Sequence, residues 1–161
     1  MTEKLRKLIE TQINKELWSA YLYADIARFY ASKDLDGLHH WFEKQAKEEY
    51  EHAEKFGDYL LELGVEYKLL PIEGPDHEFK DPREPLVFQL EHEKLVTSLI
   101  HCLMKVAKEE NDYATESLLR WYVDEQVEEE SNAAKAIALY DYYLAAGKGG
   151  LLLFDAKMGE R

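Results

Sequence analysis

The 161-residue chain has one cysteine, only four prolines and no long apolar run. A single thiol, Cys102, excludes an internal disulfide and a thiolate metal cluster, and it fits a reducing compartment. No apolar stretch approaches the ~20 residues of a membrane span, and the charged N-terminal segment lacks the apolar region of a secretory signal. We therefore expect a cytoplasmic protein without a membrane partner.

Basic residues are also scarce, since 20 Lys and Arg stand against 33 Asp and Glu, which gives a net charge of −13. This balance argues against a nucleic-acid partner, because phosphate binding needs a basic face. It leaves room for cations. Hydrophobic residues make up 46% of the chain, which is too many for disorder, and the length suits one domain with a sizeable core.

The four prolines all lie between positions 71 and 85, so they divide the chain into two proline-free halves. Proline breaks helix interiors, and each half divides again at turn signals: Asp34 to Gly37 in the first half and Asn111-Asp112 in the second. In front of the second half, Asp81-Pro82 resembles a helix cap with proline at the first helical position. The predicted helices span residues 2–32, 35–64, 82–110, 112–146 and, for a short last one, 150–158.

The segment 65–81 is too long for a turn. The four main helices, at 1.5 Å per residue, are each about 45 Å long. Short turns make the first two and the last two antiparallel hairpins. The 17-residue segment between the pairs reaches about 55 Å when extended, so it can cross the bundle and make the second and third helices parallel. We predict a single all-α domain over residues 1–161, a four-helix bundle with one long crossover and a short fifth helix.

Ionisable residues interrupt the inward stripe of each predicted helix near its middle. They are Glu16, Glu49, Glu93 and Glu129, and His52 lies one turn from Glu49. An isolated buried carboxylate costs several kcal/mol or becomes protonated. The neighbouring lysines, Lys15 and Lys94, fall off the inward stripes. A bound divalent cation is the simplest compensation for four carboxylates in one layer.

The spacing of these residues repeats between the two halves. Glu16 to Glu49 and Glu93 to Gln126 are both 33 residues, and Glu16 to His52 and Glu93 to Glu129 are both 36. Gln126-x-x-Glu129 in the second half is thus equivalent to Glu49-x-x-His52 in the first. The two residues of each pair lie on one helix face, because they are three apart. A glutamate from each of two helices plus Glu-x-x-His from the other two is a di-iron carboxylate pattern. Oxygen ligands with one imidazole suit Fe(II), Mn(II) or Zn(II).

Further residues adjoin this layer, and their patterns leave alternatives open. Glu48, Glu125 and Glu128 form either a solvated acidic face or a looser cation site beside Glu129. Tyr23 lies two turns after Glu16 on the same face, where it can be a hydrogen-bond partner, an electron donor or part of the core.

Four segments of the chain resemble the non-haem ferritins of bacteria and archaea, which belong to the ferritin-like di-iron superfamily. The segments, in chain order, are INKELWSAYLY, FEKQAKEEYEHAEKFGDYL, LEHEKLVTSLI and RWYVDEQVEEE. The resemblance extends over essentially the whole chain, including the long connection and the short tail. It implies a ferritin-like bundle with a ferroxidase centre inside each subunit.

The resemblance also implies a role for each site residue. The first iron takes Glu16 and His52, Glu49 bridges, and the second iron takes Glu93 and Glu129 with Gln126 beside it. A third iron site takes Glu48, Glu125, Glu128 and Glu129, and Tyr23 lies beside the centre. The implied function is oxidation of Fe(II) by dioxygen or peroxide and storage of a ferric mineral in a homo-oligomeric shell, typically of about 24 subunits.

Two related families differ from this chain at defined positions. Bacterioferritins have a second Glu-x-x-His where this chain has Gln126 and Glu129, and a haem-binding methionine where it has Tyr50, so we expect no haem. Rubrerythrins add a cysteine-rich iron domain, which one cysteine cannot provide. The alternatives are a di-metal oxidase or peroxidase, rubrerythrin-like but without storage, and an acidic bundle that binds cations or a partner without redox chemistry.

Overall fold

The computed structural model describes residues 1–160, which form five α-helices and no strand. The helices are α1 (Glu3–Ala31), α2 (Asp36–Glu62), α3 (Glu84–Glu109), α4 (Tyr113–Ala145) and α5 (Gly150–Met158). The predicted all-α fold, a four-helix bundle with a short fifth helix, is confirmed.

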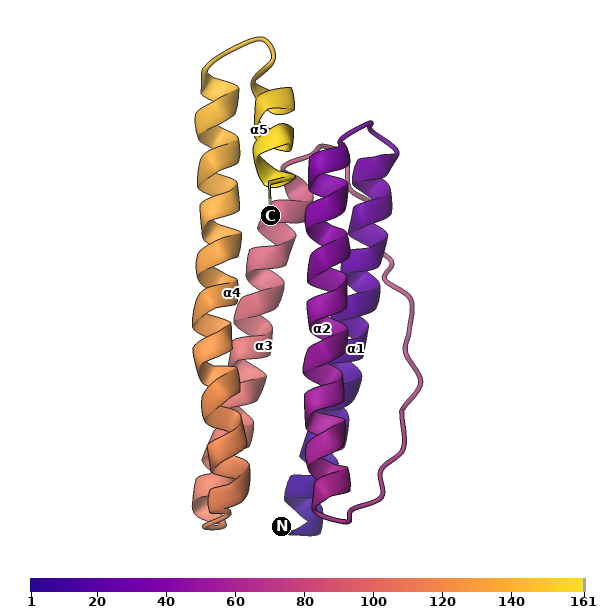
Figure 1. The fold of residues 1–161 in the computed structure, drawn as a ribbon, viewed down its shortest axis with the longest axis vertical. Coiled ribbons are helices and arrows are strands. Elements are labelled where there is room, and N and C mark those ends of the chain that lie inside the picture. Colours follow the sequence, from indigo (N-terminus) through magenta and orange to yellow (C-terminus); the bar gives the residue numbers. More distant parts are fainter. Residues whose placement is uncertain (161) are drawn as a thin grey trace.

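The helices are arranged as two antiparallel hairpins, α1 with α2 and α3 with α4 (Figure 1). The segment between α2 and α3 runs in extended form along the outside of the first hairpin, so α2 and α3 point the same way (Figure 1). Asn14 fixes this crossover to α1, because its side-chain amide donates to the carbonyl oxygens of Leu70 at 3.2 Å and Pro71 at 3.1 Å.

The start of α3 differs from the prediction. The predicted first residue was 82, but the helix begins at Glu84. Asp81 Oδ1 accepts from the backbone N–H groups of Arg83 at 2.8 Å and Glu84 at 3.2 Å, so the aspartate closes a turn ahead of the helix. Pro85 therefore lies in the first helical turn, where its missing N–H leaves no hydrogen bond unmade.

The short helix α5 folds back against the start of α2 and caps it. The residue at the N-cap position of α2, Leu35, makes no side-chain cap. Asp155 of α5 accepts instead from the backbone N–H groups of Gly37 at 3.1 Å and Leu38 at 2.8 Å. The two segments touch so closely that a Cβ on Gly37 would lie 1.8 Å from the Asp155 carbonyl oxygen.

The hydrophobic core consists of two clusters. One packs around Ile9, Phe56 and Tyr122, and the other around Tyr30, Phe42 and Phe154. Along α1 the two clusters are separated by the turns that carry Gln12, Glu16 and Ser19, all of which are buried. The predicted inward stripes are correct in the middle of the bundle. Continued from His52 in alternating steps of four and three, the stripe of α2 predicts Leu63 as buried, but Leu63 is 46% exposed and Leu60 is buried instead.

Candidate metal centre

Three of the predicted ligands meet between α1 and α2. Glu16, Glu49 and His52 are buried, and each offers a ligand atom within 4.8 Å of those of the other two. The Nδ1 atom of His52 lies 3.5 Å from Glu49 Oε2. One helical turn brings Glu49 and His52 to the same face of α2, as their spacing predicts.

The second hairpin contributes Glu93 from α3 and Glu129 from α4, both buried. The charges of Glu93 and Glu129 raise the pKa of Glu49. The three carboxylates are therefore close enough to repel one another and belong to one layer. A second compact group joins His52 with Glu125 and Glu129, again with ligand atoms within 4.8 Å of one another. His52 thus belongs to both groups.

The other predicted acids of the third site lie further out. Glu125 is half-buried, and its Oε1 lies 3.8 Å from His52 Nε2. Glu48 is half-buried and Glu128 is exposed, and their charges help burial to raise the pKa of Glu125. Within residues 1–160, neither joins a compact group of three candidate ligands. A third site built from all these acids stays a prediction.

Buried amides and a phenol hold the carboxylates in place. Gln45 Nε2 donates to Glu129 Oε2 at 2.9 Å, and the Tyr23 hydroxyl donates to Glu93 Oε1. Gln126 Nε2 donates to Glu93 Oε2 at 3.2 Å, so in this structure the amide orients a carboxylate. Such supporting hydrogen bonds fix the geometry of ligands that a metal then binds.

Sequence reasoning missed Gln12, whose Nε2 donates to Glu16 Oε1 at 2.9 Å. It lies four residues before Glu16, and residues at this spacing are neighbours on one helix face. That spacing was the available signal. The alternating 3–4 stripe passes from Ile9 through Ile13 to Glu16 and skips it.

The low polarity of the layer keeps protons on the acids. Burial raises the pKa of Glu16 to about 7, and burial together with the charge of Glu129 raises that of Glu93 to about 8. The pKa of Glu49 is raised well above its usual value, first by burial and then by the charges of its neighbours. Burial lowers the pKa of His52 to about 4, so its imidazole is neutral and free to bind a metal.

The donor set fits a first-row divalent metal. Glu16 Oε2 is buried and accepts from no amide or hydroxyl; its neighbour is the Glu49 carboxyl, and a cation can replace the proton that these two acids share. Carboxylate oxygens with one neutral imidazole suit the first-row divalent metals. His52 of α2 is the nitrogen donor of both compact groups, whereas the second hairpin contributes to them only the carboxylate oxygens of Glu125 and Glu129.

Comparison with known proteins decides the family. The family model described as a ferritin-like domain matches residues 6–141. The chain belongs to the ferritin family. A bacterial non-heme ferritin of Bacteroides fragilis is 34% identical over 161 residues, which cover 100% of this chain and 99% of that protein. A probable bacterial non-heme ferritin-like protein of Haemophilus influenzae is 35% identical over 159 residues, covering 99% and 96%.

Solved ferritin structures have the same fold. The open pore ferritin of the archaeon Archaeoglobus fulgidus is 37% identical, with a TM-score of 0.96 and coverage of 100% of this chain and 99% of that one. The predicted resemblance to bacterial and archaeal ferritins is therefore confirmed.

None of the helices formed by residues 1–160 is long and apolar enough to cross a membrane.

Proposed function

We propose that the protein oxidises Fe(II) at the Glu16–Glu49–His52–Glu93–Glu129 layer and stores the ferric product as a mineral inside a cytoplasmic shell of identical subunits. The buried carboxylate layer carries this proposal, because four glutamates around one neutral histidine have too much negative charge to stay ionised without cations. Two Fe(II) ions supply the positive charge that balances the carboxylates.

Iron binding at this layer is coupled to proton release. The acids must lose their protons to become ligands, so each Fe(II) replaces protons on Glu16, Glu49 and Glu93. Two Fe(II) ions held by one shared carboxylate, Glu49, can together give dioxygen the two electrons that reduce it to peroxide. Carboxylates bind Fe(III) more strongly than Fe(II), which favours this oxidation.

The difference between the two half-sites supports storage over a permanently bound cofactor. The hairpin with Glu93 and Glu129 adds no imidazole of its own to the layer, so iron on that side shares His52 at most, and Gln126 occupies the position that would complete a second Glu-x-x-His. Iron on this side has fewer strong donors. We infer that ferric iron leaves from this side, past Glu125 and Glu128, toward the mineral.

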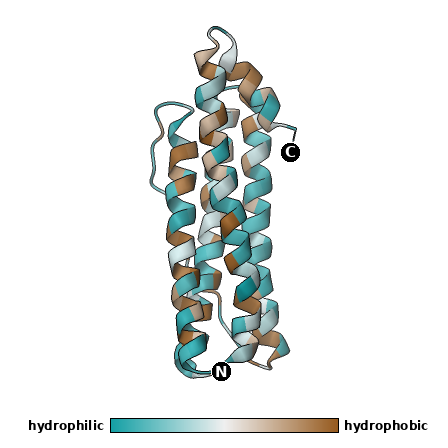
Figure 2. Ribbon diagram, turned by 90° about the vertical axis from the view of Figure 1, so that its left-hand side faces the viewer, coloured by the Kyte–Doolittle hydropathy of each residue, from teal (hydrophilic) through white to brown (hydrophobic). Residues whose placement is uncertain are grey.

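Exposed apolar residues support assembly into a shell. On α1, α2 and the crossover, Tyr21, Tyr50 and Ile72 are 54%, 51% and 42% exposed and line one shallow pocket. On α5, Leu152 is 65% exposed and Leu153 is 60% exposed. Figure 2 shows hydrophobic residues gathered at this end of the bundle. Apolar patches of this kind mark contacts between protein chains. We propose a shell of about 24 subunits with closed symmetry.

Aerobic addition of Fe(II) to the metal-free protein tests the activity. Wild-type protein should form Fe(III) far faster than buffer alone, as followed by the absorbance of ferric species. Glu49→Gln keeps the size of the side chain and removes the shared ligand, so it should lower the initial rate by at least ~100-fold, the range seen when a positioned catalytic group is removed.

Glu54→Gln is the matched control, because Glu54 lies on the same helix and is exposed. It should oxidise iron at the wild-type rate. Wild-type protein that is no faster than buffer, or a Glu49→Gln variant that is as fast as wild type, would contradict the proposal. Tight stoichiometric iron without further uptake would favour the di-metal oxidase or peroxidase instead.

A further inference from the structure

A row of rings connects the metal layer with the outer surface of the bundle. Tyr23 is fully buried and donates its hydroxyl to Glu93. Its ring lies edge-on to the ring of His92, with 5.9 Å between centroids. The ring of His92 in turn lies 5.2 Å from that of Trp18. Three rings from α1 and α3 thus follow one another outward from Glu93.

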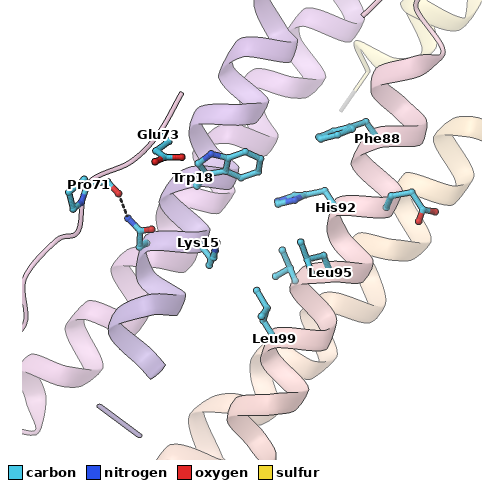
Figure 3. A pocket seen from close by; sticks show the side chains of 11 residues that line it. Lys15, Trp18, Pro71, Glu73, Phe88, His92, Leu95 and Leu99 are labelled. Carbon is cyan, nitrogen blue, oxygen red and sulfur yellow. Dashed lines mark hydrogen bonds between the residues drawn. The ribbon is translucent and has the colours of Figure 1, made fainter. Parts of the chain in front are cut away.

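The row ends at a cavity of about 540 Å³ between α1, α3 and the crossover. Trp18 and His92 line it side by side, with Phe88 and Leu95 on the α3 side and Pro71 and Glu73 on the crossover side (Figure 3). Trp18 is half-buried, so its indole touches both the protein interior and the cavity. A small solute in the cavity can therefore reach the outermost ring.

The middle ring is held in one position. Ser19 Oγ lies 2.7 Å from His92 Nε2, and Ser19 itself is fully buried. Figure 3 shows the imidazole extending from α3 toward α1, beside the indole of Trp18. A fixed ring in contact with both neighbours provides a continuous path between Tyr23 and Trp18.

We propose that Tyr23, His92 and Trp18 form a one-electron relay that carries an oxidising equivalent from the iron centre to the outer cavity, where a thiol or ascorbate reduces Trp18. The proposal rests on the proposed ferroxidase function. Tyrosine and tryptophan are the side chains that most readily lose one electron, whereas His92 acts as the bridge between them. The relay is needed when hydrogen peroxide reacts at a centre that holds only one Fe(II), because a second electron is then missing.

The electrons and protons balance. Reducing hydrogen peroxide to two waters takes two electrons and two protons, but one Fe(II) supplies only one electron when it becomes Fe(III). Tyr23 supplies the second electron and passes its phenolic proton to the Glu93 carboxylate, which holds it, and solvent supplies both protons that the peroxide takes up. Trp18 then gives one electron to the Tyr23 radical and releases its indole proton to water in the cavity. Tyr23 regains a proton through Glu93, and a hydrogen atom from the thiol or ascorbate restores Trp18.

A second tryptophan near the centre is less suited to this task. The ring of Trp121 lies 5.4 Å from that of His52, but the ammonium of Lys55 lies 4.1 Å from the Trp121 ring centroid. A cation over an aromatic face stabilises the electron-rich ring and opposes the loss of an electron from it. Within residues 1–160, no cation lies over Trp18 in this way. The structure therefore favours Trp18 as the final donor.

The test loads the metal-free protein with one Fe(II) per chain without oxygen and adds one equivalent of hydrogen peroxide. Rapid freezing with electron paramagnetic resonance follows the radicals, and peptide mass spectrometry locates oxidised tryptophan. Wild-type protein should show a short-lived tyrosyl radical and oxidation at Trp18, both suppressed by added ascorbate.

Four variants separate a relay from simple packing. Trp18→Phe should prolong the tyrosyl radical several-fold, Trp18→Tyr should restore its fast decay, and His92→Leu should slow the decay. Trp41→Phe, which changes a tryptophan outside this row, should leave the decay unchanged. Circular dichroism checks that each variant is folded.

The results distinguish failure of the relay from failure of the ferroxidase proposal. Fe(III) formation together with oxidation at Trp121, or with a radical lifetime that Trp18→Phe does not change, would overturn the relay alone. If no Fe(III) forms even with two Fe(II) per chain and excess peroxide, both proposals are overturned.

Discussion

At the scale of single residues, the decisive feature is a layer of acids buried beyond what protein groups alone can compensate. The sequence showed the four glutamates and His52 through their register and repeated spacing, because helix geometry ties position in the chain to position on a face. Hydrogen-bond partners could not be predicted so well. The spacing of Gln12 places it beside Glu16, but whether its amide reaches that carboxylate, and whether Gln45 reaches Glu129, depends on which side-chain rotamers the packed core permits.

The raised carboxyl pKa values predict that the metal-free protein loses stability as pH rises. Below a pH of about 4.5, the ordinary value for glutamate, the folded and unfolded chains both keep these protons. Between that value and about 8, Glu16 and Glu93 stay protonated only when folded, and this stabilisation is lost as pH rises through about 7 to 8. Urea unfolding of metal-free protein at a series of pH values measures the effect.

Zn(II) provides the control for this prediction, because it binds without redox chemistry. Zn(II) should remove most of the loss at high pH, since it neutralises the ionised carboxylates. Glu16→Gln should flatten the pH dependence of the metal-free protein. An unfolding free energy that rises between pH about 6 and about 8 without metal would contradict the raised pKa values of Glu16 and Glu93.

A second prediction concerns Gln89, which is fully buried with neither side-chain amide atom hydrogen-bonded. Gln89→Met has a similar volume and removes the unpartnered amide, so it should stabilise the protein by about 1–2 kcal/mol. Gln45→Met is the matched comparison and should have the opposite sign, because the Gln45 amide donates to Glu129. Urea unfolding measures the free energy of unfolding of both variants relative to wild type. Equal destabilisation by the two substitutions would show that the Gln89 amide has a hydrogen-bond partner.

At the scale of elements, helix existence followed from proline distribution and apolar register, whereas helix ends depended on contacts across the fold. The start of α3 moved to Glu84 because the Asp81 side chain closed a turn first. The predicted turn at Asp34 to Gly37 precedes α2 but supplies no side-chain cap, and Asp155 from the far end of the chain caps the helix instead. No local pattern reveals a cap that lies more than a hundred residues away.

Removing this distant cap should detach α5 and destabilise the start of α2. Asp155→Ala removes the acceptor for the N–H groups of Gly37 and Leu38, at a cost of about 1–2 kcal/mol. Urea unfolding measures the loss, and amide hydrogen exchange should be faster at Gly37 and Leu38. Asp58→Ala, at an exposed position in the interior of α2, is the control and should change neither quantity. Unchanged exchange at Leu38 in Asp155→Ala would contradict the capping role.

At the scale of the whole molecule, the chain has features that a monomer does not explain. A net charge of −13 favours solubility, yet large apolar side chains are exposed along α1, α2, the crossover and α5. The helix register places Tyr50 beside the inward stripe, but it does not tell a contact residue from an isolated exposed one, and Ile72 lies in the crossover, where no helical register applies. Only the fold showed that Tyr50 and Ile72 face outward beside one another.

Charges placed in this pocket should break the shell. The double variant Tyr50→Glu, Ile72→Glu introduces two acids where we propose that two chains meet, and an unpaired buried charge in an interface is strongly destabilising. Size-exclusion chromatography with light scattering should show small species in place of the large particle. Tyr50→Phe keeps the ring and should assemble normally. A double variant that still forms the large particle would exclude this surface as an essential contact.

The most direct test of the central claim is the mass of the particle together with its iron content after aerobic loading with excess Fe(II). The protein should form one closed particle of about 24 subunits. Its iron should exceed many times over the two ions per chain that the centres can hold, and Glu49→Gln should assemble equally well but fill slowly. A monomer or dimer that stops at two irons per chain would contradict this claim.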